Sequence, residues 1–348
     1  MIEKYLDDLE SRIDPDVEEA LISGWKDFSD GKFKGGFFVA QRTKKIPSRI
    51  KWPQVTVNEA LDDVTMMAIQ QLATCSRALA DGSGALMCVR SNYGTGILPS
   101  VFGADIFLMD AELNTLPTSL PLHGDRAKIE GLIERGIPDL RGGYGKRTFD
   151  AGEYFQAMFA SYPKISRYVK IYHPDLQGPM DVCELLWGSS IFLDIVDHPE
   201  LVKSFLSLVT ETYAAFMVEW NKIAPLAADY SVHWSLMHKG TVMLRDDSAM
   251  NFSPDMFDEF IRPYDQRLLN MFGGGAIHFC GKGDHYIHLV GQMTGVHAVA
   301  MSQPEYNNMD VIFDNTVDRG IRLIGLSRKA GEAAVARGRD LRGNVHCW

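Results

Sequence analysis

The feature of this chain that most constrains its fold is an alternation of short apolar runs with helical segments. From about residue 80 onward, apolar runs end in Gly, Pro, Asn or Asp, and most are followed by a segment with helical periodicity. This alternation is typical of a parallel β-sheet covered by helices. The predicted strands are 37–40, 85–89, 169–172, 232–244 (two apolar runs counted as one strand), 276–279, 296–301, 323–326 and 345–347.

Eight parallel strands are the number that closes a (β/α)8 barrel. An open, doubly wound sheet is the main alternative, but no G-x-G-x-x-G turn follows the first strand. Residues 1–80 are predicted to be mainly helical, with helices at 1–13, 15–28 and 58–80 and with Asn58 as the N-cap of the third. We therefore expect an α/β protein of one structural domain. It would have a helical N-terminal extension (1–80) and a TIM barrel (81–348), with the first strand near 37–40.

The charge balance limits the classes of partner. The formal net charge is −10, from 45 acidic and 35 basic side chains, and a field of that sign opposes binding to nucleic acid or to an anionic membrane. No run approaches the ~20 apolar residues that span a bilayer, and the charged N-terminus does not resemble a signal peptide. Five cysteines without an export signal indicate a reducing compartment. We expect a cytoplasmic protein with no nucleic-acid or membrane partner.

The sequence His278-Phe279-Cys280 carries the clearest chemical signal. The two ligand-type residues are two positions apart at the end of a predicted strand, so both side chains point to the same side. Imidazole nitrogen and thiolate sulfur are ligands that Zn²⁺ favours. Such a pair alone is more often explained by core packing and a hydrogen bond to a backbone carbonyl.

Further ligands are sought at the ends of the later strands. Cys347 lies at the end of the last predicted strand and is the best third ligand, because a barrel would bring that end to the same mouth. Gln303 and Glu305 follow the strand 296–301, and either of them, or water, would supply the fourth position. Three protein ligands and one open position are what a catalytic zinc requires.

Three loops that follow predicted strands offer candidate substrate-binding or catalytic side chains. They supply Arg90, Asn92 and Tyr93 in the first loop, Gln177 and Asp181 in the second, and Asp246 and Asp247 in the third. The adjacent carboxylates of Asp246 and Asp247 could raise each other's pKa or hold a cation. Turn and cap chemistry before the helix that begins near Pro254 explains the pair equally well.

Together these residues resemble the uroporphyrinogen decarboxylase superfamily, and in particular its zinc-dependent, corrinoid-linked methyltransferase branch. The motifs are the segment 278–281 (His-Phe-Cys-Gly), Gln177-Gly178-Pro179, Ser253-Pro254 with the helix to Pro263, and the segment 99–104. The resemblance covers roughly residues 35–348. It implies a (β/α)8 barrel and a zinc ion held by His278, Cys280 and Cys347, as in the coenzyme M methyltransferases.

The resemblance also implies the reaction. The chain would move a methyl group between a small substrate (a thiol, methyl ether or methylamine) and a corrinoid. Because the sequence lacks the Asp-x-His-x-x-Gly motif of a cobalamin-binding domain, the corrinoid would arrive on a separate carrier protein. In this interpretation Asp181, Tyr93 and Asp247 are the catalytic candidates. Arg90, Asn92, Tyr93, Gln177 and Asp181 would bind substrate. A homodimer is left open.

Two other functions remain in view. A decarboxylase-like lyase acting on an acidic or tetrapyrrole substrate would need no metal, but the Arg-Gln-Ala-Gly-Arg stretch of the decarboxylase has no counterpart here. A non-enzymatic metal- or corrinoid-binding protein would have a closed four-ligand site. Metal content separates the lyase from the other two functions.

Overall fold

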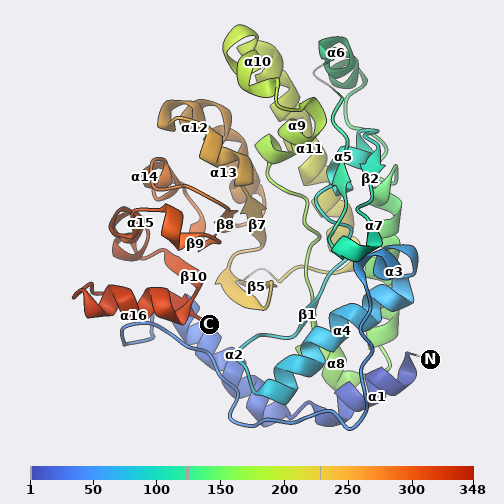
Figure 1. Cartoon of the computed structure of the whole chain (residues 1–348), viewed down its shortest axis with the longest axis vertical. Helices are drawn as coiled ribbons and strands as arrows, with labels where there is room; N and C mark the ends of the chain where they lie inside the picture. Colours follow the sequence, from blue (N-terminus) through green and yellow to red (C-terminus); the bar gives the residue numbers. More distant parts are fainter. Residues whose placement is uncertain (1, 123–124, 228) are drawn as a thin grey trace.

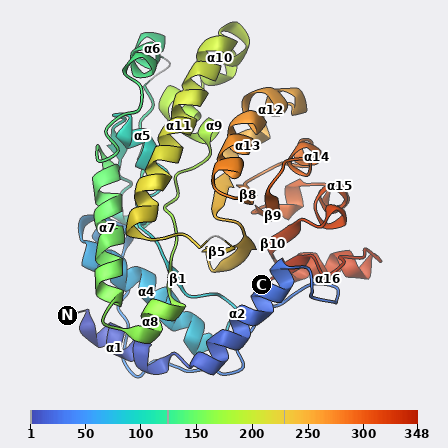
Figure 2. The same ribbon diagram turned by 180° about the vertical axis from the view of Figure 1, so that it is seen from behind.

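The structure is a computed structural model of the chain and describes residues 2–122, 125–227 and 229–348. Helices surround several short sheets, the largest of which is parallel (Figure 1). The same arrangement seen from behind places the N-terminal helices across one end of the molecule (Figure 2). A mixed α/β fold with a parallel sheet, as predicted, is therefore confirmed.

The C-terminal half contains a five-stranded parallel sheet in the order β11-β10-β9-β8-β7. A helical segment follows each of β7, β8, β9 and β10, as expected for parallel strands, which need crossover connections. The strands are β7 (Val242–Arg245), β8 (Gly275–Phe279), β9 (Val296–Met301), β10 (Arg322–Leu326) and β11 (Val345–Cys347). The helices are α12 (Pro254–Phe260), α13 (Arg262–Met271), α14 (Ile287–Val290), α15 (Met309–Asn315) and α16 (Arg328–Ala336).

The first half is less regular. β1 (Cys88–Val89) pairs in parallel with β4 (Lys170–Ile171), whereas β2 (Ile106–Phe107) and β3 (Thr118–Ser119) form an antiparallel pair that the sequence did not predict. The helices are α5 (Ile97–Val101), α6 (Arg126–Arg135), α7 (Tyr144–Phe159), α8 (Pro163–Tyr168), α9 (Pro179–Trp187), α10 (Ile191–Asp197) and α11 (Pro199–Ile223). Short 3-10 turns occur at η1 (Ala111–Leu113), η2 (Asp247–Asn251), η3 (Pro304–Tyr306) and η4 (Val317–Arg319).

The predicted strand 232–244 is wrong as a single element. Residues Tyr230–His233 (β5) and Leu236–Lys239 (β6) form an antiparallel hairpin, and β7 begins only at Val242. The turn consists of Trp234 and Ser235, with φ values of 49° and 65°. Both residues of a two-residue hairpin turn commonly have positive φ, normally with Asn or Gly, so the sequence carried no turn signal. The hairpin lies between β1 and the five-stranded sheet (Figure 1).

The strand ladder does not close on itself in the described part of the chain. At one seam, Phe38 forms a parallel bridge with His346, which joins the predicted strand 37–40 to β11. Among the described residues no ladder joins 37–40 to β1, and between β4 and β7 the ladder is interrupted again. There the backbone N–H of Met243 donates to His173 Nε2 (3.2 Å), and Gly178 N–H donates to Arg245 O (2.7 Å). The parallel α/β character is observed, but complete closure into a barrel is not.

The N-terminal segment is helical, as predicted, with one correction. The helices are α1 (Glu3–Arg12), α2 (Pro15–Ser29), α3 (Val57–Asp62) and α4 (Val64–Asp81); residue 1 of the predicted first helix lies outside the described residues. The predicted helix 58–80 breaks at Asp63, whose backbone is extended and whose carboxylate accepts from Thr65 N–H and Met66 N–H. Thr56, not Asn58, caps α3 through a reciprocal capping box with Glu59.

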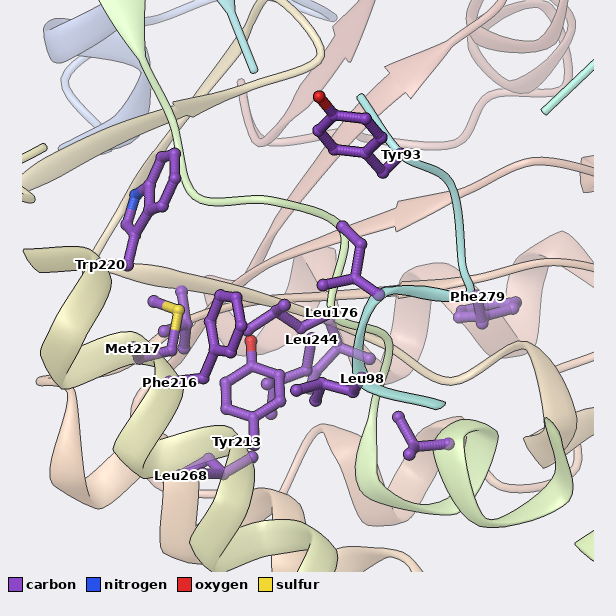
Figure 3. Close-up of a cluster of buried hydrophobic side chains, with 14 of the residues drawn as sticks. Tyr93, Leu98, Leu176, Tyr213, Phe216, Met217, Trp220, Leu244, Leu268 and Phe279 are labelled. Atoms are coloured by element: carbon purple, nitrogen blue, oxygen red, sulfur yellow. The ribbon is translucent and has the colours of Figure 1, made fainter. Parts of the chain in front are cut away.

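Two hydrophobic clusters lie on opposite sides of the strands. The inner cluster includes Phe38, Met243, Ala276 and Ile324, together with Trp25 of α2. The outer cluster packs the other side of the strands against the helices. Figure 3 shows part of it, with Tyr213 and Phe216 of α11 beside Leu176 and Leu244. The residues of one strand therefore alternate between the two clusters.

Among the helices of the described residues, α11 alone is long and apolar enough to cross a membrane. It has 25 residues, and its most apolar window has a mean hydropathy of 1.3, with 61% of that window buried inside the protein. The sequence-based expectation that no segment qualifies is therefore wrong by length and composition. The same length and composition also occur in core helices of soluble proteins.

Candidate metal centre

His278 and Cys280 stand at the end of β8, where alternation along the strand places them on the inner side together with Ala276. The Cys280 sulfur lies 3.4 Å from His278 Nε2, and it lies 3.4 Å from Ser302 Oγ at the end of β9. The two-residue spacing thus produces the paired side chains that the sequence predicted.

Asp247 reaches the same point from the neighbouring strand. It follows β7 at the start of η2, and its Oδ1 lies 3.6 Å from His278 Nε2 and accepts from Cys280 N–H (2.8 Å). Among the described residues, Asp247, His278 and Cys280 offer ligand atoms that all lie within 4.8 Å of one another. A carboxylate oxygen, an imidazole nitrogen and a sulfur therefore converge; we call these three residues the metal cluster.

The environment of the metal cluster sets the protonation of two members. Burial lowers the pKa of His278 to about 4, against the opposing effect of the Asp247 carboxylate. The imidazole is therefore neutral at pH 7 and can donate a lone pair. Burial, together with Asp247 and Asp181, raises the pKa of Cys280 to about 11. The thiol keeps its proton unless a cation stabilises the thiolate.

Cys347, the predicted third ligand, does not lie in the metal cluster. Cys347 belongs to the outer hydrophobic cluster. A Cβ built on Gly331 of α16 would lie only 2.6 Å from its sulfur. The inward residue of β11 is instead His346, whose ring lies 4.4 Å from that of Trp25. Alternation along β11 therefore turns the cysteine away from the cluster.

Neither candidate for a fourth ligand belongs to the metal cluster. The side-chain oxygen of Gln303 accepts from Gly281 N–H at 2.6 Å, which holds the loop after Cys280 in place. Glu305 is exposed in η3 and is not part of the metal cluster. The structure thus supports neither residue as a ligand.

A pocket of about 400 Å³ opens beside the metal cluster, and Gln177, Asp181, Asp247 and Ser248 contribute to its lining. Both carboxylate oxygens of Asp181 accept backbone N–H groups, from Asp247 (3.0 Å) and Ser248 (2.8 Å). Burial and the neighbouring carboxylates of Asp247 and Asp246 raise the pKa of Asp181 well above its usual range. Gln177 has a φ of 65°, a backbone strain that is often found at binding sites. The structure brings these three sequence candidates together.

Arg90 lies in a charged cluster on the inner side. Its guanidinium pairs with Asp175, and the same carboxylate pairs with Arg245. Two guanidinium groups therefore share one carboxylate, and the side chain of Arg245 is 2% exposed. One positive charge is left without a compensating carboxylate within this group of three.

Tyr93 and Asn92 are not supported as site residues. Tyr93 is buried in the outer hydrophobic cluster, where its ring packs 5.3 Å from Tyr144 and beneath the guanidinium of Arg147. Burial raises the pKa of its hydroxyl. Neither residue lines the pocket beside the metal cluster. The side chain of Tyr93 completes the core, so the structure does not bring it to the metal cluster or to this pocket.

Trp234 is the site residue that sequence reasoning missed. Its ring lies 4.7 Å from the His278 ring in an edge-to-face contact, and the Arg245 guanidinium lies 4.7 Å from the Trp234 ring. The tip of the hairpin β5–β6 thus supports the metal cluster from the inner side. In the sequence, Trp234 looks like any aromatic residue of the predicted strand 232–244, so nothing indicates that it contacts His278.

Comparisons with known proteins give a likeness of fold. No protein-family model and no curated protein sequence matches the chain. The solved structure of a methyltransferase from Methanosarcina mazei is similar, with a TM-score of 0.60 and 18% sequence identity over 84% of this chain and 82% of that chain. At this identity the likeness establishes a shared fold.

Proposed function

We propose that this protein is a zinc-dependent methyltransferase that moves a methyl group between a small substrate and a corrinoid carried on a separate protein. The observation that carries the proposal is the convergence of Asp247, His278 and Cys280 within 4.8 Å. The motif resemblance and the shared fold with a methyltransferase support the same chemistry.

The three donors fit zinc. Zn²⁺ binds nitrogen, sulfur and carboxylate oxygen, and a catalytic site keeps three protein ligands and an open position. Nε2 of His278 faces both the Cys280 sulfur and the Asp247 carboxylate. Nε2 is thus the nitrogen that would bind the metal. Asp247 takes the place that the resemblance assigned to Cys347.

The protein's own groups would orient the reactants. A bound Zn²⁺ supplies Lewis acidity, which stabilises a substrate thiolate or polarises a methylated heteroatom. Asp181 holds the turn that carries Asp247 through two backbone hydrogen bonds. Ser302 contacts the Cys280 sulfur. Gln177 and Asp181, which line the adjacent pocket, would position the substrate.

The strands are best understood as an interrupted (β/α)8 barrel, and this is also part of the proposal. The bridge from Phe38 to His346 closes one seam, and the side chain of His173 spans the gap between β4 and β7. In such barrels the active site lies at the C-terminal ends of the strands, and the metal cluster lies at the ends of β7 and β8.

The first test measures bound metal. We expect the purified protein to carry close to one zinc per chain, measured by inductively coupled plasma mass spectrometry. Cys280→Ser and His278→Ala should lose the metal. The matched control, Cys347→Ser, should keep it, because that sulfur faces α16. Metal loss in Cys347→Ser with retention in Cys280→Ser would refute the proposed ligand set.

The second test measures methyl transfer. Zinc-loaded protein is incubated with free methylcobalamin and a panel of thiols, and demethylation is followed by the absorbance change of the corrinoid. We expect the rate to fall at least about 100-fold in His278→Ala. Equal rates with and without metal would reject zinc-dependent methyl transfer.

One observation favours the lyase as a second candidate. The uncompensated charge of Arg90, Asp175 and Arg245 is suited to a substrate carboxylate. A decarboxylase would keep its activity after removal of metal by a chelator, whereas the methyltransferase would lose it. Release of CO₂ from a carboxylate substrate by chelator-treated protein would therefore decide for the lyase.

A further inference from the structure

A second cavity is separate from the metal cluster. It measures about 580 Å³ and lies between β4 and the hairpin strand β5, where α2 and α8 also contribute to its lining. Its lining shares no residue with that of the pocket beside Asp247. Its volume falls within the range of small-molecule sites.

The inner wall includes His233, which is 1% exposed. His238 Nδ1 lies 2.8 Å from the carbonyl oxygen of Lys239, which can only accept, so this nitrogen carries the proton. Burial keeps His238 neutral, with a pKa lowered to about 4. Its Nε2 must then accept from His233 Nδ1, 2.7 Å away.

The consequence is a fixed tautomer for His233. Since Nδ1 donates and burial lowers the pKa of this ring well below its usual range, Nε2 is left as a bare acceptor. It has no hydrogen-bond partner among the described residues. A buried acceptor without a partner is costly, so the cavity favours a molecule that brings an O–H or N–H donor to this end.

The outer part of the cavity is basic. Its charged lining comprises Lys26, Arg167 and Lys170 against Glu19 and Asp229. Arg167 already pairs with Glu19 at 2.5 Å. The exposed Lys26 and Lys170 have no ion-pair partner in the part of the chain that the structure describes. These two ammonium groups favour an anionic group at the mouth.

The middle of the cavity is apolar and aromatic, with Leu86, Phe159, Tyr172 and Met237 among its lining residues. We propose that this cavity is a second binding site for a small aromatic acid. The ring would lie between these side chains, a hydroxyl or N–H group would donate to His233 Nε2, and the carboxylate would face Lys26 and Lys170. This site does not depend on the metal or on the proposed methyl transfer.

Three matched probes test the proposal by isothermal titration calorimetry at pH 7. The first, 4-hydroxybenzoate, has both the donor and the carboxylate; benzoate lacks the hydroxyl; phenol lacks the charge. We expect 4-hydroxybenzoate to bind about tenfold more tightly than either partial probe. Equal affinity of benzoate and 4-hydroxybenzoate would overturn the assignment of His233 as acceptor.

Variants separate this cavity from the metal cluster. The double variant Lys26→Gln with Lys170→Gln changes only exposed side chains. In this variant 4-hydroxybenzoate should bind no more tightly than phenol, but still more tightly than benzoate. Cys280→Ser should bind 4-hydroxybenzoate as the wild type does. His233→Phe should bind benzoate and 4-hydroxybenzoate equally well. If this variant does not fold, the comparison of the two probes on the wild type and the lysine variant still test the site. Unchanged affinity in the lysine variant, or loss of binding in Cys280→Ser, would reject the site.

Discussion

His278 and Cys280 are two positions apart on one strand, so their shared direction follows from backbone geometry alone. The position of Cys347 could not be derived in this way. β11 has only three residues. Its short apolar pattern is compatible with Cys347 pointing either to the inner or to the outer side. Because His346 packs against Trp25 and Phe38 on the inner side, the side chain of Cys347 points to the outer side. A single-residue difference in register thus changes the ligand set.

Trp234 offers a residue-scale test of the metal cluster. Because its ring contacts the His278 ring, Trp234→Ala should free that imidazole and weaken zinc binding by about tenfold, the lower end of measured effects for groups that orient metal ligands. Competition with a chromogenic chelator measures the change.

The conservative variant supplies the control. Trp234→Phe keeps an aromatic edge-to-face contact and should bind zinc within about threefold of the wild type. Wild-type affinity in Trp234→Ala would show that the indole does not orient His278.

At the scale of elements, the contact between β7 and α13 buries two carboxyl groups. Asp246 follows β7 and is 2% exposed, and Asp265 of α13 is fully buried. Their carboxyl groups contact each other, and among the described residues no other hydrogen-bond donor reaches their oxygens. Burial raises the pKa of Asp265 to about 8 and that of Asp246 well above its usual range. The pair is therefore protonated at neutral pH and can share a proton.

This pair predicts a pH dependence of stability. A carboxyl group with a folded pKa above its unfolded value of about 3.9 binds more protons when folded. Its stabilising contribution is complete below about pH 4 and is lost as the pH rises through about 8. Asp265→Asn removes this titration and keeps an amide donor toward Asp246. Relative to the variant, the wild type should lose roughly 3–4 kcal/mol of unfolding free energy between pH 5 and 8, because a proton bound only in the folded state is worth about 1.4 kcal/mol per pH unit.

Urea denaturation at several pH values measures the difference, and the exposed Asp255→Asn in α12 serves as the control. The comparison with a variant is necessary because buried histidines act in the opposite direction. The pKa of His173 is lowered to about 3, so its contribution is lost as the pH falls below about 6.5. Parallel pH curves for wild type and Asp265→Asn would contradict a shared proton.

At the scale of the whole molecule, the N-terminal segment closes the strand arrangement. Phe38 N–H donates to Val345 O (2.7 Å), and Cys347 N–H donates to Phe38 O (2.9 Å). The Phe38 ring stacks 4.9 Å from Phe28 of α2 and contacts Trp25 and His346. Two backbone hydrogen bonds and the packing of the Phe38 ring therefore hold the segment around Phe38 against β11.

Deletion of that ring should be costly. Phe38→Ala leaves a cavity in the inner cluster and should lower the free energy of unfolding by about 3–5 kcal/mol, measured by urea denaturation. The adjacent Phe37→Ala, whose ring is half-buried against Gly331 on the other side, should cost clearly less. Equal losses would show that residues 37–40 do not close the structure through Phe38.

Most of the correctly predicted helices and strands follow from patterns in the local sequence. The strands β8, β9, β10 and β11 and the helices α1 and α2 were predicted within a few residues, because alternating apolar runs and caps are properties of adjacent residues. The hairpin β5–β6 was missed because its turn has no Gly or Asn. The break at Asp63 was missed because the apolar periodicity continues on both sides of it.

The order of the amino acids was enough to establish the parallel α/β character and the pairing of His278 with Cys280, since both depend on neighbours a few positions apart. Only the folded chain decided that Asp247 joins that pair, that Cys347 turns away, and that Tyr93 belongs to the core. These outcomes depend on contacts between segments more than thirty residues apart, where packing and strand register, and not local preference, select the position of each side chain.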